Sequence, residues 1–423
     1  MRLLYSWLIR CAVPFAYLRI LWRGIGDRSY WHGLGERLGR GSRLTAPSIW
    51  LHAVSLGEMT AAAPLLRALR ARYPPMPLVV TTATPAGRAR AQSLLGKDAD
   101  IRFLPYDTPG SVRRFLARTQ PRAGIIMETE LWPNLLRECE RRAIPVLLAS
   151  ARLSAKSVTS YRRFGNLFRG VFTANLAVAA QSDDDAERFR AIGAGAAQVS
   201  VVGNVKFDLE LDAGVAGVGG ALRDALGRSR PVWVAGSTHA GEEEQLLDAH
   251  ALLKTPHPDA LLLLVPRHKD RFDGVADLLT RRGISFARRS AMASIGENVS
   301  VLLGDTVGEL STLYAAADIA FVGGSLVAIG GHNLLEPAAL GLPVLTGPSY
   351  SNGQEIAQLL LARGAALQVN SADELAGVLR RLIENPSERE RIGRVGQEII
   401  AANRGSLAKL LALVDALLEA RIN

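Results

Sequence analysis

The chain has 423 residues, of which 48% are hydrophobic and 21% are charged. This composition excludes a disordered chain, and the length exceeds what one core usually fills, so about two or three domains are expected. The net charge of +10 favours an anionic partner, which is nucleic acid, an acidic lipid surface or a phosphorylated substrate. Two cysteines, Cys11 and Cys139, exclude a disulfide framework and a cysteine-based metal site, and they fit a reducing compartment.

Residues 1–45 are predicted to form an N-terminal membrane-associated segment. Residues 3–22 are rich in Leu, Ile and aromatic residues, but the longest stretch without charge, Cys11–Leu18, has only eight residues. A spanning helix needs about 20 apolar residues, and no small-residue cleavage site marks a signal peptide. Arginines among aromatic residues suit a helix that lies in an anionic membrane interface. A helix docked on the protein's own surface and a short tilted anchor are the alternatives.

After residue 45, short apolar runs alternate with helical patterns, which is typical of parallel sheets covered on both faces. The apolar runs are 49–52, 78–82, 101–104, 124–127, 145–148, 177–180 and 199–202 in the first half, and 232–235, 261–265, 299–303, 319–322, 343–345 and 366–369 in the second. A glycine-rich span at 212–220 separates the halves. We therefore predict an N-terminal Rossmann-like domain over 46–211, a linker over 212–225, a C-terminal Rossmann-like domain over 226–400, and a C-terminal helix over 401–423 that packs back on the first domain.

Three stretches of the first half place charged residues where strands end. Glu58 lies at the start of a helix just after the run 49–52, where a carboxylate held over a cleft is a candidate base, although the helix dipole alone also explains it. Glu128 and Glu130 follow the run 124–127; they share one side if the strand continues and diverge if a turn has begun. Lys206 follows the last strand of this half, where it either holds an anionic group or is a solvated surface lysine.

In the second half, glycine-rich loops follow successive predicted strands and indicate a nucleotide site. Gly236–His239 opens a helix, and its Ser or Thr is expected either to cap that helix or to cradle a phosphate. Arg267 ends the run 261–265, where arginine is suited to grip phosphate. Gly308 and Glu309 start another helix. Two glycine pairs precede Glu336, whose carboxylate can accept hydrogen bonds from ribose hydroxyls.

Several function classes lack their motifs. The seven histidines are scattered, and no HExxH or CxxC pattern indicates a zinc site. No GxxxxGK[ST] loop indicates an ATPase, and no GxSxG elbow indicates a serine hydrolase. We therefore expect chemistry without a metal or other cofactor.

Five motifs in order resemble the 3-deoxy-D-manno-octulosonic acid (Kdo) transferase family of lipid A and lipopolysaccharide biosynthesis. They are His52–Glu58 (HAVSLGE), Met127–Asn134 (METELWPN), Val265–His268 (VPRH), Gly304–Glu309 (GDTVGE), and Phe321–Ser325 (FVGGS) with Gly331–Glu336 (GHNLLE). The resemblance covers nearly the whole chain. It implies a GT-B type α/β glycosyltransferase fold, with two Rossmann-like domains that face a central cleft and an N-terminal membrane-associated helix.

The resemblance also implies residue roles. By motif position Glu58 is the proton acceptor, and Glu128 and Lys206 stabilise the transition state. The residues implied to bind CMP are Pro266, Arg267, Val307, Gly308, Glu309, Asn333, Leu334, Leu335 and Glu336. Leu334 and Pro337 vary from the family pattern, but Asn333 and Glu336 remain.

The implied reaction is an inverting transfer of Kdo from CMP-Kdo to the lipid A precursor (lipid IVA). The implied location is the cytoplasmic face of the inner membrane of a Gram-negative cell, at an anionic membrane surface. The resemblance implies a reaction without a cofactor or a metal ion, and it implies no nucleic-acid partner. Two alternatives stay open. One is another two-lobed sugar-nucleotide enzyme, a UDP-sugar transferase or epimerase. The other is a nucleic-acid-binding protein, which only the charge of +10 suggests.

Overall fold

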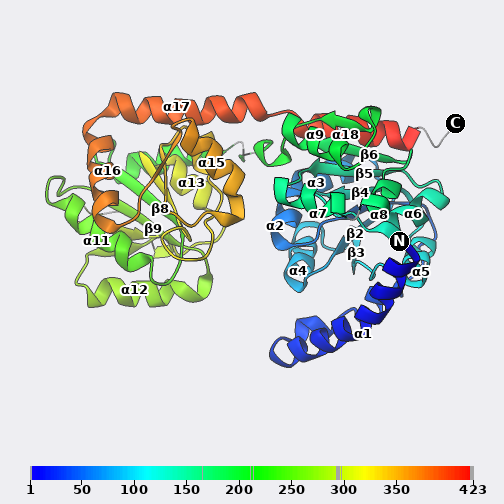
Figure 1. The fold of residues 1–423 in the computed structure, drawn as a ribbon. Coiled ribbons are helices and arrows are strands. Elements are labelled where there is room, and N and C mark those ends of the chain that lie inside the picture. Colours follow the sequence, from blue (N-terminus) through cyan, green and yellow to red (C-terminus); the bar gives the residue numbers. More distant parts are fainter. Residues whose placement is uncertain are drawn as a thin grey trace. The chain divides into compact units, whose positions relative to one another are not determined.

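The computed structural model describes residues 2–163, 165–209, 211–212, 214–291, 296 and 298–419. It divides the chain into two compact units (Figure 1). The N-terminal unit comprises Met1–Asp208 and Asn403–Asn423, and the C-terminal unit comprises Leu209–Ala402. Residue 1, residue 213 of the predicted linker and residues 420–423 of the predicted C-terminal helix lie outside the described residues.

A parallel sheet of seven strands, in the order β3-β2-β1-β4-β5-β6-β7, forms the centre of the N-terminal unit. The strands are β1 (Ser48–His52), β2 (Leu78–Thr82), β3 (Ala99–Phe103), β4 (Pro121–Met127), β5 (Val146–Ala151), β6 (Leu176–Ala180) and β7 (Val199–Val201). The helices between them are α2 (Leu56–Ala61), α3 (Ala63–Arg72), α4 (Pro85–Leu95), α5 (Pro109–Thr119), α6 (Pro133–Arg141), α7 (Ala155–Arg163), α8 (Gly165–Phe168) and α9 (Asp183–Ala191). This is the alternation that the sequence predicts.

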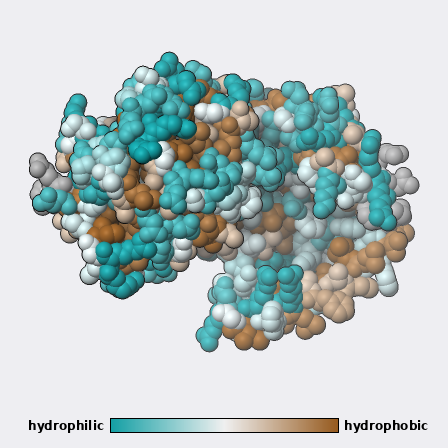
Figure 2. Space-filling model, turned by 60° about the vertical axis from the view of Figure 1, so that its left-hand side comes forward, coloured by the Kyte–Doolittle hydropathy of each residue, from teal (hydrophilic) through white to brown (hydrophobic). Residues whose placement is uncertain are grey.

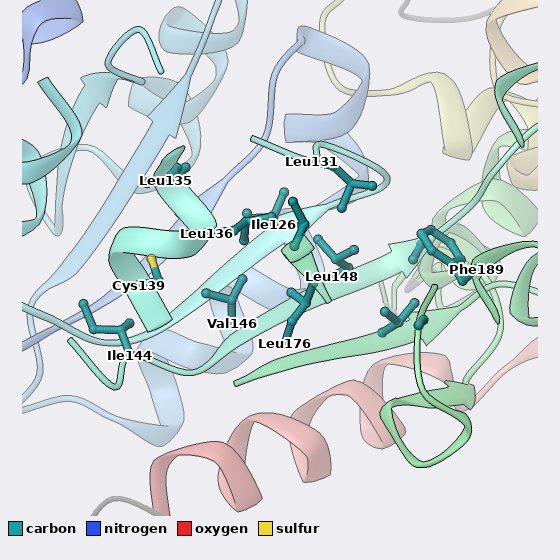
Figure 3. Packing of buried hydrophobic residues seen from close by; sticks show 14 of the residues in the cluster. Ile126, Leu131, Leu135, Leu136, Cys139, Ile144, Val146, Leu148, Leu176 and Phe189 are labelled. Carbon is teal, nitrogen blue, oxygen red and sulfur yellow. The ribbon is translucent and has the colours of Figure 1, made fainter. Parts of the chain in front are cut away.

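Both faces of this sheet are buried, because alternate strand residues enter two different cores. Trp50 of β1 packs in one core with residues of β4, β5 and α6, which Figure 3 shows from close by. Leu51 packs in the other core, which helix α18 (Ser406–Glu419) covers with Leu410 and Val414. Asp208 fixes the start of α18, since its carboxylate accepts the backbone N–H of two residues at that helix end, each at 2.6 Å.

The N-terminal unit begins with helix α1 (Arg2–Gly26), which continues through Pro14. Residues Leu3–Gly26 are long and apolar enough to cross a membrane, by length and composition. The large hydrophobic side chains along it are exposed: Leu3, Leu4, Trp7, Leu8, Phe15, Leu18, Leu21, Trp22 and Ile25. In Figure 2 hydrophobic residues gather along the lower edge of the molecule, where α1 lies in Figure 1.

The C-terminal unit repeats the architecture, with a parallel sheet of seven strands in the order β10-β11-β9-β8-β12-β13-β14. The strands are β8 (Val232–Thr238), β9 (Leu261–Pro266), β10 (Phe286–Arg288), β11 (Val301–Leu303), β12 (Ile319–Val322), β13 (Val344–Thr346) and β14 (Ala366–Gln368). The helices are α10 (Val215–Leu226), α11 (Glu243–Lys254), α12 (Phe272–Arg281), α13 (Leu310–Ala315), α14 (Leu335–Ala339), α15 (Gln354–Ala362), α16 (Ala372–Glu384) and α17 (Pro386–Asn403). The edge strand β10 is missing from the sequence prediction, because Phe-Ala-Arg has no apolar run.

The predicted linker over 212–225 is wrong for most of its length, because α10 occupies it. The glycines there serve helix packing: a Cβ added at Gly219 would lie 2.4 Å from the Cβ of Ala315 in α13. Leu222 and Leu226 of α10 are buried in the core that α13 also enters. A glycine-rich helix therefore looks like a linker in sequence when its glycines permit close contact between two helices.

Candidate functional site

The carboxyl ends of β1, β4 and β7 bring Glu58, Glu128 and Lys206 together. Strands β1 and β4 are neighbours in the sheet, so the residues that follow them are close. Strand β7 is at the sheet edge, but the chain then turns back into a 3-10 helix (Val205–Phe207), whose Val205 N–H donates to Ser150 Oγ of β5 at 3.5 Å. Lys206 Nζ consequently lies 3.5 Å from Glu128 Oε1.

Glu58 is a half-buried residue in the first turn of α2. Its carboxylate accepts the N–H of Val54 at 2.8 Å and the hydroxyl of Ser55 at 3.3 Å, while Ser55 Oγ accepts the N–H of Glu58. Ser55 is the N-cap of α2, and Glu58 accepts the N–H of the residue before it, so these helix-cap contacts fix the direction of the carboxylate. Burial raises the pKa of Glu58, and Glu128 adds to the rise, while the Val54 N–H and Lys206 oppose it. A carboxylate with a raised pKa is a better base than an exposed one.

The backbone at Glu128 shows whether strand β4 continues beyond Met127. It has φ of 54°, in the left-handed region that residues with a side chain seldom adopt. A turn has therefore begun directly after Met127. The strained backbone aims the Glu128 side chain toward Lys206, and such strain tends to occur at functional sites. Ser150, at the end of the adjacent β5, has φ of 52° as well.

Glu58 and Glu128 line a pocket of about 200 Å³ in the N-terminal unit. The other lining residues are Thr129, Glu130, Arg152, Leu153, Ser154, Ser157 and Tyr161. Burial and the charge of Glu58 raise the pKa of Glu130 to about 7. In the sequence, a site role and a capping role explain Glu130 equally well, and only the fold shows that it shares the pocket. The pocket therefore contains three carboxylates, two of which have raised pKa values.

In the C-terminal unit, the predicted nucleotide residues lie after neighbouring strands. Arg267 follows β9, and residues 307–309 follow β11, which pairs with β9. Arg267 is exposed, and its backbone N–H donates to Thr238 O at the end of β8. Glu309 accepts from Arg289 at 2.9 Å and from the hydroxyl of Thr306, so its carboxylate has partners within the loop.

Residues 333–336 lie at the start of α14, where Asn333 is exposed and Glu336 is partly buried. The side chain of Asn333 accepts the N–H of Leu335 at 3.1 Å and donates to Glu336 Oε1 at 3.0 Å. Burial raises the pKa of Glu336, while Asn333 and the charge of Arg267 lower it. Arg267 and Glu336 therefore influence each other across the ends of β9 and β12.

The expected capping role of Ser237 or Thr238 is wrong, because β8 extends to Thr238 and α11 begins only at Glu243. Glu242 is the N-cap residue of α11 and is fully buried. Its carboxylate accepts the N–H groups of Gly324, Ser325 and Leu326 at 2.7–3.0 Å. Glu242 thus holds the glycine loop after β12 against the end of β8, a link between residues 82 or more apart in sequence.

Three of the histidines that look scattered in sequence meet at this edge of the sheet. They are His239, His268 and His332. Spacing in sequence gives no sign of this group, because each histidine follows a different strand. Among the described residues, no group of three or more His, Cys, Asp or Glu side chains could hold a metal ion.

Each unit is a parallel sheet with polar residues at the carboxyl ends of its strands. A chain with two such units has the GT-B class of glycosyltransferase fold. Residues 242–399 match the model of glycosyl transferases group 1. A putative UDP-N-acetylglucosamine 2-epimerase from Listeria monocytogenes has the same fold, with a TM-score of 0.54 and 13% identity over 89% of this chain and 98% of that one.

Residues 32–209 match the model of the 3-deoxy-D-manno-octulosonic-acid transferase (kdotransferase) family. A 3-deoxy-D-manno-octulosonic acid transferase of Haemophilus influenzae is 39% identical over the full length of both chains. Another, from Bordetella pertussis, is 40% identical over 97% of this chain and 98% of its own. The chain therefore belongs to the 3-deoxy-D-manno-octulosonic acid transferase family, and the resemblance of its motifs to that family is confirmed.

Proposed function

We propose that the protein transfers Kdo from CMP-Kdo to the lipid A precursor with inversion at the transferred carbon, without a metal ion. The observation that carries this proposal is the pocket in which Glu58 and Glu128 lie together, with Lys206 3.5 Å from Glu128, in a chain of the Kdo transferase family. The alternatives that bind UDP-sugars share the fold, which does not by itself select the nucleotide.

In the proposed step, an acceptor hydroxyl attacks the anomeric carbon of Kdo as CMP departs with the electrons of the broken bond. Glu58 takes the hydroxyl proton while the new bond forms, and its contacts with Val54 and Ser55 keep the carboxylate aimed during the transfer. Lys206 supplies positive charge for the carboxylate of Kdo or for the developing phosphate charge. Glu128 orients Lys206 through their ion pair. A single displacement of this kind inverts the transferred carbon.

On the donor side, we assign CMP to Pro266–Arg267, Val307–Glu309 and Asn333–Glu336. Arg267 is exposed at a strand end, where its guanidinium can meet a phosphate in a bidentate manner. Asn333 and Glu336 already hold each other at the start of α14. Their amide and carboxylate are suited to hydroxyl and amino groups of a nucleoside.

Product analysis tests the reaction. Purified protein with CMP-Kdo and tetra-acylated lipid A precursor should give a product heavier by one or more Kdo residues in mass spectra. CMP should compete with the donor, whereas UDP should not. Competition by UDP without competition by CMP would refute the assignment and favour the UDP-sugar alternatives.

We further propose that α1 lies along the cytoplasmic surface of the inner membrane and does not span it. A helix of 25 residues is about 38 Å long at 1.5 Å per residue, enough to span. The first two-thirds of α1, however, bind the globular unit that follows. Tyr5 donates to Asp107 and Ser6 to Asn134 near its start, and Tyr17 donates to Leu34 O further along.

A spanning helix would carry residues 5–17 into the hydrocarbon, and the globular unit that binds these residues cannot follow them there. Exposed aromatic side chains among arginines suit an interfacial position on anionic lipid. Trp7, Phe15 and Trp22 are 61–72% exposed. Their triple replacement by Ala should abolish sedimentation with phosphatidylglycerol vesicles while the urea midpoint stays within error. Undiminished sedimentation would refute the anchor.

A further inference from the structure

The C-terminal unit contains a histidine pair that the proposed function does not use. His239 follows β8 and His332 lies in the loop after β12, and these strands are neighbours in the sheet. The Nε2 atoms of the two rings are 2.8 Å apart, and the ring planes differ by only 5°. The ring of His268, which follows β9, meets the ring of His239 edge to face with centroids 5.5 Å apart.

Two imidazole nitrogens at this distance share a hydrogen. In the neutral pair, one ring carries its hydrogen on Nε2 and donates it to Nε2 of the other ring, which carries its hydrogen on Nδ1. A metal ion does not fit between the two nitrogens, because each Zn–N bond alone takes about 2.0–2.1 Å. One further proton converts the pair into an imidazolium and an imidazole that keep the same hydrogen bond. The pair can therefore take up one additional proton without losing its hydrogen bond.

The charges that act on the two rings are mainly positive. Burial and the charge of Arg267 lower the pKa of His332 to about 4. Burial, His268, Arg267 and Arg271 all lower the pKa of His239. The pair is therefore neutral near pH 7. An anion beside Arg267 would cancel much of this repulsion and favour an added proton.

Three carboxylates on the segments beside this group are engaged elsewhere. Glu242 accepts four backbone N–H groups, including that of His239 at 3.3 Å. Glu243 is fully buried and pairs with Arg271 at 2.8 Å. Glu336 accepts from Asn333 at 3.0 Å. A negative charge that compensates the protonated pair therefore has to come from a ligand.

The three histidines also connect the two segments assigned to the nucleotide, because His239 contacts both His268 and His332. His268 follows Arg267 directly in sequence, and His332 directly precedes Asn333. The loop at Gly324 is shaped around the pair: Gly324 has φ of 70°, and a Cβ added there would lie 3.0 Å from the ring of His332. A phosphate that Arg267 binds would thus meet the histidine rings.

We propose that His239 and His332, together with Arg267, bind the phosphate of the nucleotide, and that the histidine pair takes up one proton as the phosphate binds. This inference rests on the proposed function for the identity of the nucleotide. A protonated pair next to the phosphate stabilises the charge that grows on CMP as it departs. The carboxylate of Kdo has similar chemistry, and the test separates the two anions.

Calorimetry with CMP, cytidine and free Kdo tests the proposal between about pH 7 and 8.5, where the phosphate of CMP is almost fully ionised because its second pKa is about 6. The affinity for CMP should rise as the pH falls, by up to about tenfold per pH unit for one proton. The affinity for cytidine should not change with pH. A pH-independent affinity for CMP would refute the inference, and proton-linked binding of Kdo alone would refute the phosphate assignment.

Histidine variants locate the proton. His332→Gln should bind CMP with an affinity that no longer depends on pH, and His239→Gln should behave in the same way if His332→Gln does not fold. His257→Gln is the control, because His257 lies in the same unit and faces Glu384 at 3.4 Å. An unchanged pH dependence in both pair variants would refute the inference. Equal binding of CMP and UMP would contradict the proposed donor itself, whereas CMP-specific binding without proton uptake would contradict only the histidine inference.

Discussion

Replacement of Glu58 separates its two roles, because the same carboxylate accepts hydrogen bonds at the start of α2 and is the proposed base. Glu58→Gln keeps an acceptor for the Val54 N–H but cannot take a proton at neutral pH. General base catalysis contributes about 10²–10⁴-fold, so kcat should fall by that factor. The hydrogen bond to Val54 becomes neutral, which should cost about 1 kcal/mol of stability at most. Binding of CMP should not change.

Ser55→Ala is the matched control. It removes the N-cap hydroxyl of α2 and should cost about 0.5–2 kcal/mol of stability, while the carboxylate of Glu58 remains. Its kcat should therefore stay within about tenfold of the wild-type value, far above that of Glu58→Gln. The assays are steady-state transfer of Kdo and urea unfolding. Wild-type turnover in Glu58→Gln would remove Glu58 as the base, and equal rate losses in both variants would show that the helix end alone matters.

Three further predictions concern other parts of the chain. Lys206→Met should lower the rate of Kdo transfer by about 10²-fold or more. It should change stability by less than about 1 kcal/mol, because the pair with Glu128 is partly exposed. Turnover near the wild-type value would contradict the proposed role of Lys206. Burial lowers the pKa of His250 from 6.5 to about 4, so the unfolded chain binds more protons in that range, and stability should fall by about 3 kcal/mol as the pH drops through it. Urea midpoints should show a smaller pH dependence in His250→Gln, and an unchanged dependence would refute the reasoning. Gly219→Ala should destabilise the protein by about 1–3 kcal/mol, because the added methyl group pushes α10 away from α13. A Cβ added at Gly220 meets nothing within 4 Å, so Gly220→Ala should be neutral or stabilising. Equal urea midpoints of the two variants would contradict this packing.

The sequence predicts the sheets well because their strands are buried on both faces. Runs such as 49–51 and 261–265 are apolar throughout, and the structure places β1 and β9 there. Strands without such a run escape prediction, as β10 does. The glycines of α10 mislead for a related reason, since local sequence does not reveal that Ala315 packs against Gly219.

Site residues are predictable where motif and strand end coincide. Glu58, Glu128 and Arg267 lie after predicted strands, so their neighbours follow from the order of parallel strands. The contacts that join distant segments do not follow in this way. Glu242 reaches Gly324 across 82 residues, and the rings of His239 and His332 meet across 93. Such pairs depend on which strands become neighbours, and sequence spacing alone does not contain that information.

A structural role for a carboxylate does not weaken its case as a catalytic group, and Glu58 shows why. A base needs a fixed direction, an accessible lone pair and a pKa close to the working pH. The hydrogen bonds from Val54 and Ser55 supply the first requirement. Position on the pocket wall supplies the second, and burial next to Glu128 raises the pKa as the third requires. The helix start that makes the sequence signal ambiguous is therefore the feature that holds this carboxylate ready to accept a proton.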